Sequence, residues 1–126
     1  MPKTARTARR SRPEPQACIA PAPHRPDPAA WADDRLTLSW LGHATVLLNF
    51  LGSVVVTDPV LEQRIGIGRG LVKLGPRRLI EPALRKRELP PLDAVLLSHA
   101  HMDHTDLGTL RSIPATTRVV VQSGNR

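Results

Sequence analysis

The sequence predicts an α/β fold with a mixed β-sheet, and three features of the chain support this prediction. Strand-like runs at 36–40, 44–50 and 53–57 follow one another across short connections, which is typical of antiparallel neighbours. An apolar run at 93–98 is followed by a short helical pattern and then by a strand-like run at 117–122. A strand, a helix and a second strand in this order favour parallel pairing. We therefore expect one sheet that contains both kinds of pairing.

Hydrophobic periodicity defines the first three strands. Leu36, Leu38 and Trp40 alternate with polar residues, and this period of two indicates a strand with one face buried. The runs at 44–50 and 53–57 are separated by a two-residue connection, so they are expected to pair as a hairpin. The continuous valines of the second run predict burial on both of its faces.

Residues 1–30 are expected to form a disordered basic tail rich in Pro and Arg, and residues 31–126 the folded part. The first thirty residues contain few large apolar side chains, so burial cannot offset the entropy of ordering them. Arg9 and Arg10 resemble a twin-arginine export signal, but no apolar segment follows them. An organellar transit peptide fits the Arg-rich opening slightly better, and a solvated tail is our preferred interpretation.

Residues 58–91 are expected to be mostly loop. The run Ile65–Gly70 superficially resembles a phosphate-binding glycine loop, but it lacks the strand before and the helix after that a dinucleotide site needs. Long loops beside a site often form its lid. Eight basic residues lie between Arg64 and Arg87 with only Glu81 to balance them. A solvated basic loop is our preferred interpretation, and a surface that holds an anionic substrate is the alternative.

The composition restricts partners and compartment. A net charge of +7 favours anionic partners, but the tail and the central loop carry most of it. Only 2% of the residues are aromatic, so we see no stacking platform for single-stranded nucleic acid and no strong nucleic-acid signal. The single Cys18 excludes an internal disulfide, and no apolar run reaches membrane-spanning length. We expect a cytoplasmic protein, with peripheral membrane association as an alternative.

The most informative stretch is His99–His104, which places three imidazoles and a carboxylate in six residues directly after an apolar run. Neutral imidazole and ionised carboxylate are ligand types that zinc and related divalent ions prefer. His99 and His101 are two apart and can point the same way from extended backbone, whereas Asp103 and His104 are adjacent and must diverge. We therefore expect two metal positions, one begun by each pair and close enough for two-metal hydrolysis. The alternative is a solvated polar loop, or a helix N-terminus capped by Asp103.

The segment after this motif is expected to contain a short helix. Thr105 or Asp106 can cap it, Leu107 and Leu110 lie on one face, and Pro114 ends it. The motif itself follows the carboxyl end of a strand, which is where sites assemble in layered α/β folds.

Three stretches together resemble a known family. Trp40–Thr45 reads WLGHAT, Thr57–Pro59 reads TDP, and Leu89–His104 joins an apolar strand to the histidine motif. In this order they resemble the metallo-β-lactamase superfamily, and more narrowly its branch with N-acyl-phosphatidylethanolamine phospholipase D and the ascorbate-6-phosphate lactonase-like proteins. The resemblance covers about residues 35–125.

The resemblance implies half of an αββα sandwich and a centre with two zinc ions. His99 and His101 match the family's ligands to the first ion, and Asp103 and His104 match those to the second. Asp103 would also orient the nucleophilic water, as the catalytic carboxylate. Asp58 matches a family position outside the ligand set, where a carboxylate holds the histidine loop in place. A cap at the strand end is an equal alternative.

Two positions bear on the substrate pocket. His43 lies in a motif near the pocket in the narrower branch, so it is a candidate pocket residue. A hydrogen-bonded structural histidine in a turn is the preferred alternative. Met102 occupies a position that is often aromatic in relatives, a departure that concerns the pocket wall and not metal binding.

The implied activity is metal-assisted hydrolysis of a phosphodiester, phospholipid or lactone, with hydroxide made available near neutrality by the bound ion. Each metal position receives only two ligands here, whereas catalytic zinc normally has three. We expect the missing ligands in segments downstream of Arg126 and interpret the chain as the N-terminal half of such a hydrolase. One alternative is a non-catalytic truncated fragment with partial metal binding, which needs a complementing chain to close its exposed sheet. The others are an oligomer in which a second copy supplies the missing ligands, and a nuclease of the same fold.

Overall fold

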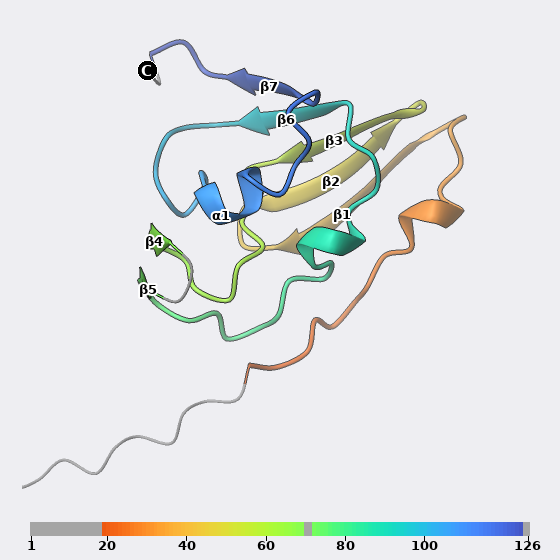
Figure 1. The fold of residues 1–126 in the computed structure, drawn as a ribbon. Helices are drawn as coiled ribbons and strands as arrows, with labels where there is room; N and C mark the ends of the chain where they lie inside the picture. Colours follow the sequence, from red (N-terminus) through yellow and green to blue (C-terminus); the bar gives the residue numbers. More distant parts are fainter. Residues whose placement is uncertain (1–18, 70–71, 125–126) are drawn as a thin grey trace, which may run out of the picture.

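A computed structural model describes residues 19–69 and 72–124, and its centre is a five-stranded mixed sheet (Figure 1). The order across the sheet is β1-β2-β3-β6-β7. The first three strands pair antiparallel, whereas β3 with β6 and β6 with β7 pair parallel, which confirms the predicted mixed sheet. The bounds of these strands are β1 Leu36–Gly42, β2 Thr45–Phe50, β3 Ser53–Thr57, β6 Ala94–Leu97 and β7 Arg118–Val121.

Short elements occupy the connections. A two-stranded sheet is formed by β4 and β5, and three single-turn helices lie before β1, before β6 and between β6 and β7. Their bounds are η1 Pro28–Ala30, β4 Ile67–Arg69, β5 Val72–Leu74, η2 Lys86–Glu88 and α1 Leu107–Leu110. None of the helices in the described parts of the chain combines the length and the apolar character that a membrane crossing needs.

The hairpin of β2 and β3 turns at the predicted two-residue connection. Leu51 and Gly52 both have positive φ, at 51° and 90°, which is the conformation of a type I′ turn. The side-chain oxygen of Asn49 accepts a hydrogen bond from the backbone N–H of Gly52 at 2.8 Å. The turn therefore has the twist that joins adjacent antiparallel strands.

The connection from β3 to β6 is less irregular than the sequence predicted. Residues 67–69 of the glycine run form β4, which pairs antiparallel with β5. Gly66 lies where the backbones on the two sides of the hairpin come very close together. A Cβ atom there would lie 2.0 Å from the carbonyl oxygen of Leu74. A residue without a side chain is needed at this close approach.

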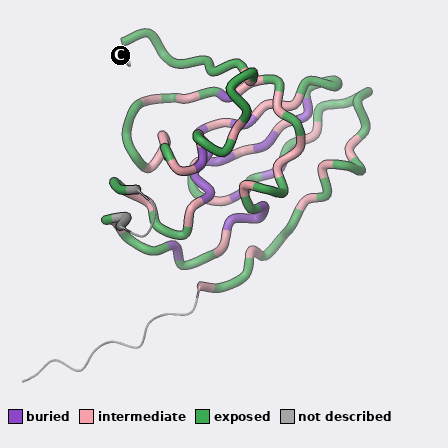
Figure 2. Tube along the Cα trace, in the orientation of Figure 1, coloured by how far each residue is buried: buried purple, intermediate pink, exposed green. Residues whose placement is uncertain are grey.

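The core lies on one face of the sheet. Leu41, Leu47, Val56 and Val95 come from four adjacent strands and have no exposed surface. Leu61, Ala83 and Leu84 of the β3–β6 connection pack against them. Figure 2 shows buried segments both in the sheet and in the chain beside it. On this face, the described parts of the connection take the place that a layer of long helices would have.

The buried face of β1 is the opposite of the one that its large apolar residues suggest. Leu36, Leu38 and Trp40 are 53%, 60% and 56% exposed, whereas Ser39 and Leu41 on the other face are buried. The alternation is as predicted, but the β3–β6 connection and α1 pack on the Leu41 side. The handedness of these crossovers decides which face is covered, and the composition of β1 does not encode it.

The exposed side of the sheet, which we call the outer face, is strongly apolar. Leu36 pairs with Phe50, and Trp40 with Val46, so their side chains lie on this face together. Leu36, Trp40 and Phe50 are each more than half exposed. An apolar sheet face normally packs against a second layer.

Residues 19–30 differ from the disordered tail in which the sequence placed them. The backbone of Ala20 donates to the carbonyl of Leu79 at 2.8 Å and accepts from the N–H of Glu81 at 2.8 Å. This pairing provides backbone hydrogen bonds where apolar burial is scarce, and several prolines in the segment reduce the entropy lost on ordering. Residues 1–18, the other part of the predicted tail, lie outside the described residues.

The two faces of the sheet predict a contrast between matched leucine variants. Leu47→Ala removes a fully buried side chain and should lower the free energy of unfolding by about 2–5 kcal/mol. Leu38→Ala on the outer face should change it by less than about 1 kcal/mol, because that side chain is 60% exposed. Urea denaturation followed by circular dichroism measures both values. Similar losses for the two variants would contradict the assignment of the buried face.

Candidate metal centre

The candidate centre lies where two parallel neighbours, β3 and β6, end at the same edge of the sheet. Thr57 is in register with Leu96, and the N–H of Asp58 donates to the carbonyl of Leu96 at 2.8 Å. Asp58 therefore leaves β3 beside Ser98 and His99, which leave β6. The carboxyl ends of parallel strands are the usual place for sites in α/β folds.

Three side chains of the motif converge. His99, Asp103 and His104 each offer a ligand atom, and these atoms all lie within 4.8 Å of one another. The loop folds back because the carbonyl of His101 accepts from the N–H groups of His104 and Thr105, at 2.9 and 2.7 Å. The hydroxyl of Thr105 also donates to the carbonyl of His99 at 2.8 Å. A short tight loop thus presents an imidazole–carboxylate–imidazole group.

His101 lies beside this group and not within it. Its ring centroid is 4.7 Å from that of His99, in an edge-to-face arrangement, and the residue is exposed. The sequence paired His99 with His101, and Asp103 with His104. The structure instead brings His99 together with Asp103 and His104.

Asp58 binds the loop from inside. Its carboxylate accepts from the backbone N–H of Ser98 at 2.8 Å and from the Ser98 hydroxyl at 2.7 Å. The second of its oxygens, Oδ2, also lies 2.9 Å from Nδ1 of His104. One carboxylate therefore holds the end of β6 and one of the converging imidazoles. The sequence proposed that Asp58 holds the histidine loop, and these three contacts join Asp58 to that loop.

These bonds indicate that Nδ1 carries a proton in both imidazoles. An ionised carboxylate only accepts, so Nδ1 of His104 carries the proton in its bond to Asp58. The single hydroxyl proton of Ser98 goes to Asp58, and therefore Nδ1 of His99, 2.9 Å from the Ser98 oxygen, is the donor in that bond. When a ring with this Nδ1 proton is neutral, its lone pair lies at Nε2, the form in which histidine binds metals.

The environment of Asp58 keeps it ionised. Burial alone would raise the pKa of its carboxyl group, but the hydrogen bond from His104 and the two from Ser98 together outweigh burial and lower that pKa below its ordinary value. Asp58 also has a positive φ of 37°, a strained conformation for a residue with a side chain. Strain of this kind persists only where surrounding bonds fix the backbone.

His43 lies beside the group although it comes from the turn between β1 and β2. Its Nε2 is 4.0 Å from Oδ2 of Asp103, and its ring centroid is 6.1 Å from that of His104. The residue has a positive φ of 55°, and its carbonyl accepts from the indole N–H of Trp40 at 2.7 Å. The structure thus adds a fourth titratable side chain that sequence spacing alone did not connect with Asp103.

The helix after the motif anchors the loop. Asp106 is the N-cap of α1, as the sequence allowed, and accepts from the N–H of Gly108 and from the hydroxyl of Thr109. The buried hydroxyl of Thr109 in turn accepts from the N–H of Leu61 in the β3–β6 connection at 3.0 Å. The loop is therefore held at both ends, by Asp58 and by Asp106.

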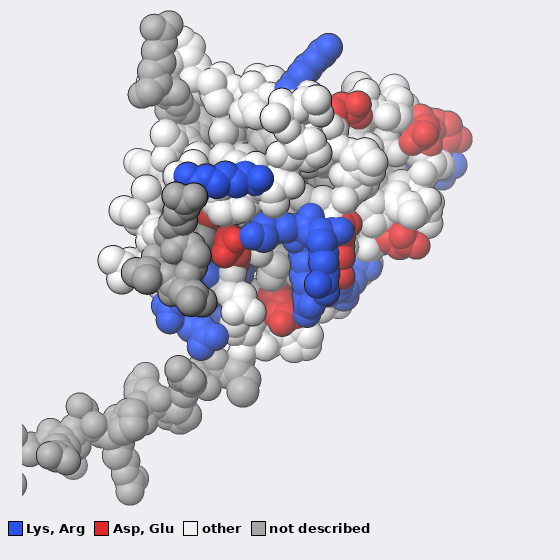
Figure 3. Space-filling model, viewed as in Figure 1, with Lys and Arg blue, Asp and Glu red and all other residues white. Residues whose placement is uncertain are grey.

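The basic cluster of residues 64–87 is partly structural. Arg78 is buried and donates to the carbonyls of Val60 and Glu62, and Lys86 pairs with the Glu62 carboxylate. Burial lowers the pKa of Arg78, with the nearby charge of Asp106 opposing that effect. On the face in Figure 3, Lys and Arg side chains lie next to Asp and Glu side chains. The charge is thus interspersed in this view, and Arg78 is no solvated loop residue.

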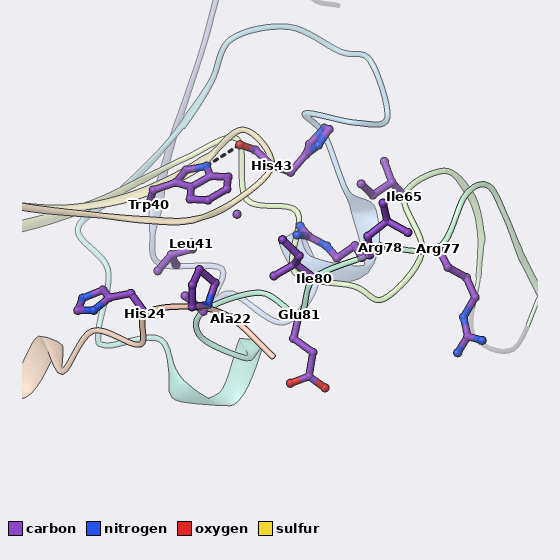
Figure 4. Close-up of a pocket in the computed structure, with 14 residues that line it drawn as sticks. Ala22, His24, Trp40, Leu41, His43, Ile65, Arg77, Arg78, Ile80 and Glu81 are labelled. Atoms are coloured by element: carbon purple, nitrogen blue, oxygen red, sulfur yellow. Dashed lines mark hydrogen bonds between the residues drawn. The ribbon is translucent and has the colours of Figure 1, made fainter. Parts of the chain in front are cut away.

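A cavity of about 320 Å³ opens next to His43, as Figure 4 shows. Trp40 and Leu41 of β1 form one side of it, and Ile80 lies on the other side. Ala22 from the N-terminal segment also contacts it. The candidate pocket residue His43 therefore lies in the wall between this cavity and the converging ligands.

Comparison with known proteins identifies the family. The sequence profile described as "Beta-lactamase superfamily domain" matches residues 54–125, more than half of the chain. An uncharacterized protein of Mycobacterium tuberculosis is 40% identical over 84 residues, which are 67% of this chain and 22% of that protein. The N-acyl-phosphatidylethanolamine-hydrolyzing phospholipase D 1 of Caenorhabditis elegans is 38% identical over 82 residues, 65% of this chain and 22% of the relative.

A solved structure shares the fold. The isothiocyanate hydrolase from Delia radicum gut bacteria superposes with a TM-score of 0.54 and 26% identity, over 68% of this chain and 33% of that one. The present chain spans only 22%, about a fifth, of the length of each of the two curated relatives from M. tuberculosis and C. elegans.

The lowered pKa of Asp58 predicts a pH-dependent contribution to stability. Because that pKa is lower in the folded than in the unfolded chain, the stabilisation is complete above the unfolded value of about 4 and is lost as pH falls through the folded value. Asp58→Asn should lower the free energy of unfolding by about 1.5–3 kcal/mol at neutral pH and by much less in strong acid. Urea denaturation across the pH range, without added metal, measures this difference.

Asp34→Asn is the matched control, because the Asp34 carboxylate is exposed and pairs only with its neighbour Arg35 among the interactions described. It should change stability by less than about 0.5 kcal/mol at any pH. An Asp58→Asn deficit of the same size in acid as at neutral pH would contradict the stated cause.

Proposed function

This chain belongs to the metallo-β-lactamase superfamily, and we propose that it is the metal-binding part of a zinc-dependent hydrolase. The observation that carries the proposal is the orientation of the two imidazoles. Nδ1 of His104 bonds to Asp58 and Nδ1 of His99 bonds to Ser98, which leaves Nε2 of each ring for an ion, and Nε2 of His104 lies 3.6 Å from Oδ2 of Asp103. A solvated polar loop would not need its histidines fixed in this tautomer.

The donor set fits a zinc ion. Two neutral imidazoles and one carboxylate are borderline and hard ligands of the kind that catalytic zinc binds, with one further position left for water or substrate. His99, Asp103 and His104 would hold the ion, and Asp58 would orient His104 from outside the ligand set. A divalent ion there lowers the pKa of water and polarises a phosphoryl or carbonyl oxygen.

Asp103 is the proposed catalytic carboxylate. Its Oδ2 lies 3.6 Å from Nε2 of His104 and 4.0 Å from Nε2 of His43, and its side chain is 48% exposed. It can therefore accept a proton from water that approaches from solvent. His43 lies on the cavity side of this carboxylate, where a substrate would contact it.

We propose a phosphodiester, and in particular a phospholipid, as the substrate class. The relative from C. elegans is named for hydrolysis of an N-acyl-phosphatidylethanolamine, and the apolar cavity next to His43 supports a substrate with an apolar portion. A lactone is the other class that the sequence motifs favour. No described stacking surface supports the nuclease alternative.

We also propose that residues 31–126 are one portion of a larger αββα domain. The described ligands suffice for one ion, so a second ion would need ligands from outside the described residues. The apolar outer face supports this proposal, because the sandwich has a second sheet that packs on such a face. A second copy of the chain is the alternative source of the ligands for a second ion and of the layer that covers the outer face.

The central experiment is metal analysis of histidine variants. Zinc titration by isothermal calorimetry, with elemental analysis after dialysis, should show one tight site in the wild type. His99→Ala or His104→Ala should weaken it by at least about 100-fold, because each removes one of three ligands. His24→Ala is the control, because this exposed histidine is not part of the group. Unchanged affinity in His104→Ala would refute the proposal.

His101→Ala separates one-ion from two-ion binding. If His101 belongs to a second position, the variant loses a second, weaker equivalent of zinc and keeps the first. If one ion is bound by the converging group alone, stoichiometry and affinity stay as in the wild type. Elemental analysis at saturating zinc measures the stoichiometry.

Asp58→Asn tests the orienting role. The variant should weaken zinc binding by about 10–100-fold, the usual effect of removing a carboxylate that orients a metal-binding histidine. Asp93→Asn is the matched control, since Asp93 also accepts a backbone N–H, that of Val54 at 2.7 Å, but on another part of the sheet. Equal zinc affinity in the two variants would show that Asp58 does not act on the centre.

A further inference from the structure

We propose that the cavity beside His43 binds the apolar chain of an anionic amphiphile, with the N-terminal segment 20–24 as one of its walls. That this amphiphile is the substrate rests on the proposed function. That the cavity binds an apolar chain does not, because it follows from the lining of the cavity alone.

The lining is apolar where a ligand would lie. Ala22, Leu41, Ile80 and Ala83 contact the space, and Trp40 adds the largest apolar surface. Arg77 and Glu81 border the cavity, but Figure 4 shows their charged ends pointing away from it. The volume of about 320 Å³ lies within the range of about 300–1,000 Å³ that ligand pockets span. An unbranched hydrocarbon chain matches such a surface better than a polar ligand.

The wall at residues 20–24 is ordered by backbone pairing. Ala20 bridges to Ile80 in parallel orientation, with two hydrogen bonds of 2.8 Å to the neighbouring Leu79 and Glu81. This pairing places Ala22 in the cavity wall and against the core. Ile80 and Leu79, at 44% and 74% exposed, remain accessible at the rim. The segment thus closes the side of the cavity that lies next to the apolar, open rim formed by Leu79 and Ile80.

Positive charge lies at the end of the cavity nearest the histidine group. Arg78 contacts the cavity, and its Nη1 is close enough to Gly42 that a Cβ atom there would lie 3.0 Å away. The carbonyls of Val60 and Glu62 hold the guanidinium in place, and its charge is permanent. An anionic group at this end of the ligand, and an apolar chain at the other, match this distribution.

His43 joins the cavity to the candidate metal centre. It lies in the cavity wall, and its Nε2 is 4.0 Å from the Asp103 carboxylate. A ligand whose chain fills the cavity would therefore have its anionic group next to the proposed zinc ligands. The chain would supply binding energy distant from the bond that reacts.

Monomeric n-alkyl phosphates of increasing chain length test the proposal. Their affinities are measured by isothermal calorimetry with the whole chain, below the micelle-forming concentration, after chelator treatment and again with zinc. In chelator the dissociation constant should fall about fourfold for each added methylene until the cavity is filled. Zinc should then tighten binding of every chain length by a similar factor.

Two phenylalanine variants provide the matched comparison. Ala22→Phe fills part of the cavity. The affinity of this variant for alkyl phosphates should therefore stop increasing at a shorter chain length than in the wild type. Ala30→Phe adds the same side chain at an exposed position in η1, outside the cavity wall. It should leave the dependence of affinity on chain length unchanged. Far-UV circular dichroism melts verify that both variants keep the fold.

Each outcome has a distinct meaning. Affinity in chelator that does not depend on chain length, or the same series in Ala22→Phe as in the wild type, would overturn the proposed cavity. Binding to phosphatidylcholine vesicles without binding of monomers would also overturn it, in favour of a membrane-docking surface. A normal chain-length series with no effect of zinc would keep the cavity and refute the metal-dependent function.

Discussion

The carboxylate of Asp58 is the interaction on which the site depends. It accepts from the backbone and the hydroxyl of Ser98 and lies 2.9 Å from Nδ1 of His104. These bonds offset the burial of the charge and the positive φ of Asp58, which costs about 1–3 kcal/mol. They are available only because β3 and β6 are parallel neighbours that end at the same edge. The contacts that arrange the site therefore depend on the topology of the sheet.

The sequence indicated the candidate ligands, but it did not indicate how they group in space. The types and the spacing of His99, His101, Asp103 and His104 indicate metal chemistry by themselves, and family resemblance added Asp58. Which of the motif residues converge depends on how the loop folds back on the carbonyl of His101, and spacing does not encode that. Ser98 could not be recognised, because serine is common and its role arises only from the contact with Asp58.

The strand positions were also predictable, but the covered face was not. The alternation of apolar and polar residues located β1 correctly, because successive side chains of a strand point to opposite faces whichever face is buried. The side of the sheet on which the β3–β6 connection packs follows from crossover handedness, a property of several elements together. The same limit applies to residues 19–30, whose order comes from pairing with Leu79 and Glu81 and not from their own composition.

Trp40 links the apolar outer face to the candidate site. Its side chain is 56% exposed and also borders the cavity, while its indole N–H donates to the carbonyl of His43 at 2.7 Å. That bond supports the positive φ of His43, which directs the imidazole toward Asp103. Any layer that packs on the outer face would contact Trp40 and restrict its rotamers. Covering this face would therefore also fix His43, so that packing on the outer face and organisation of the site are physically coupled.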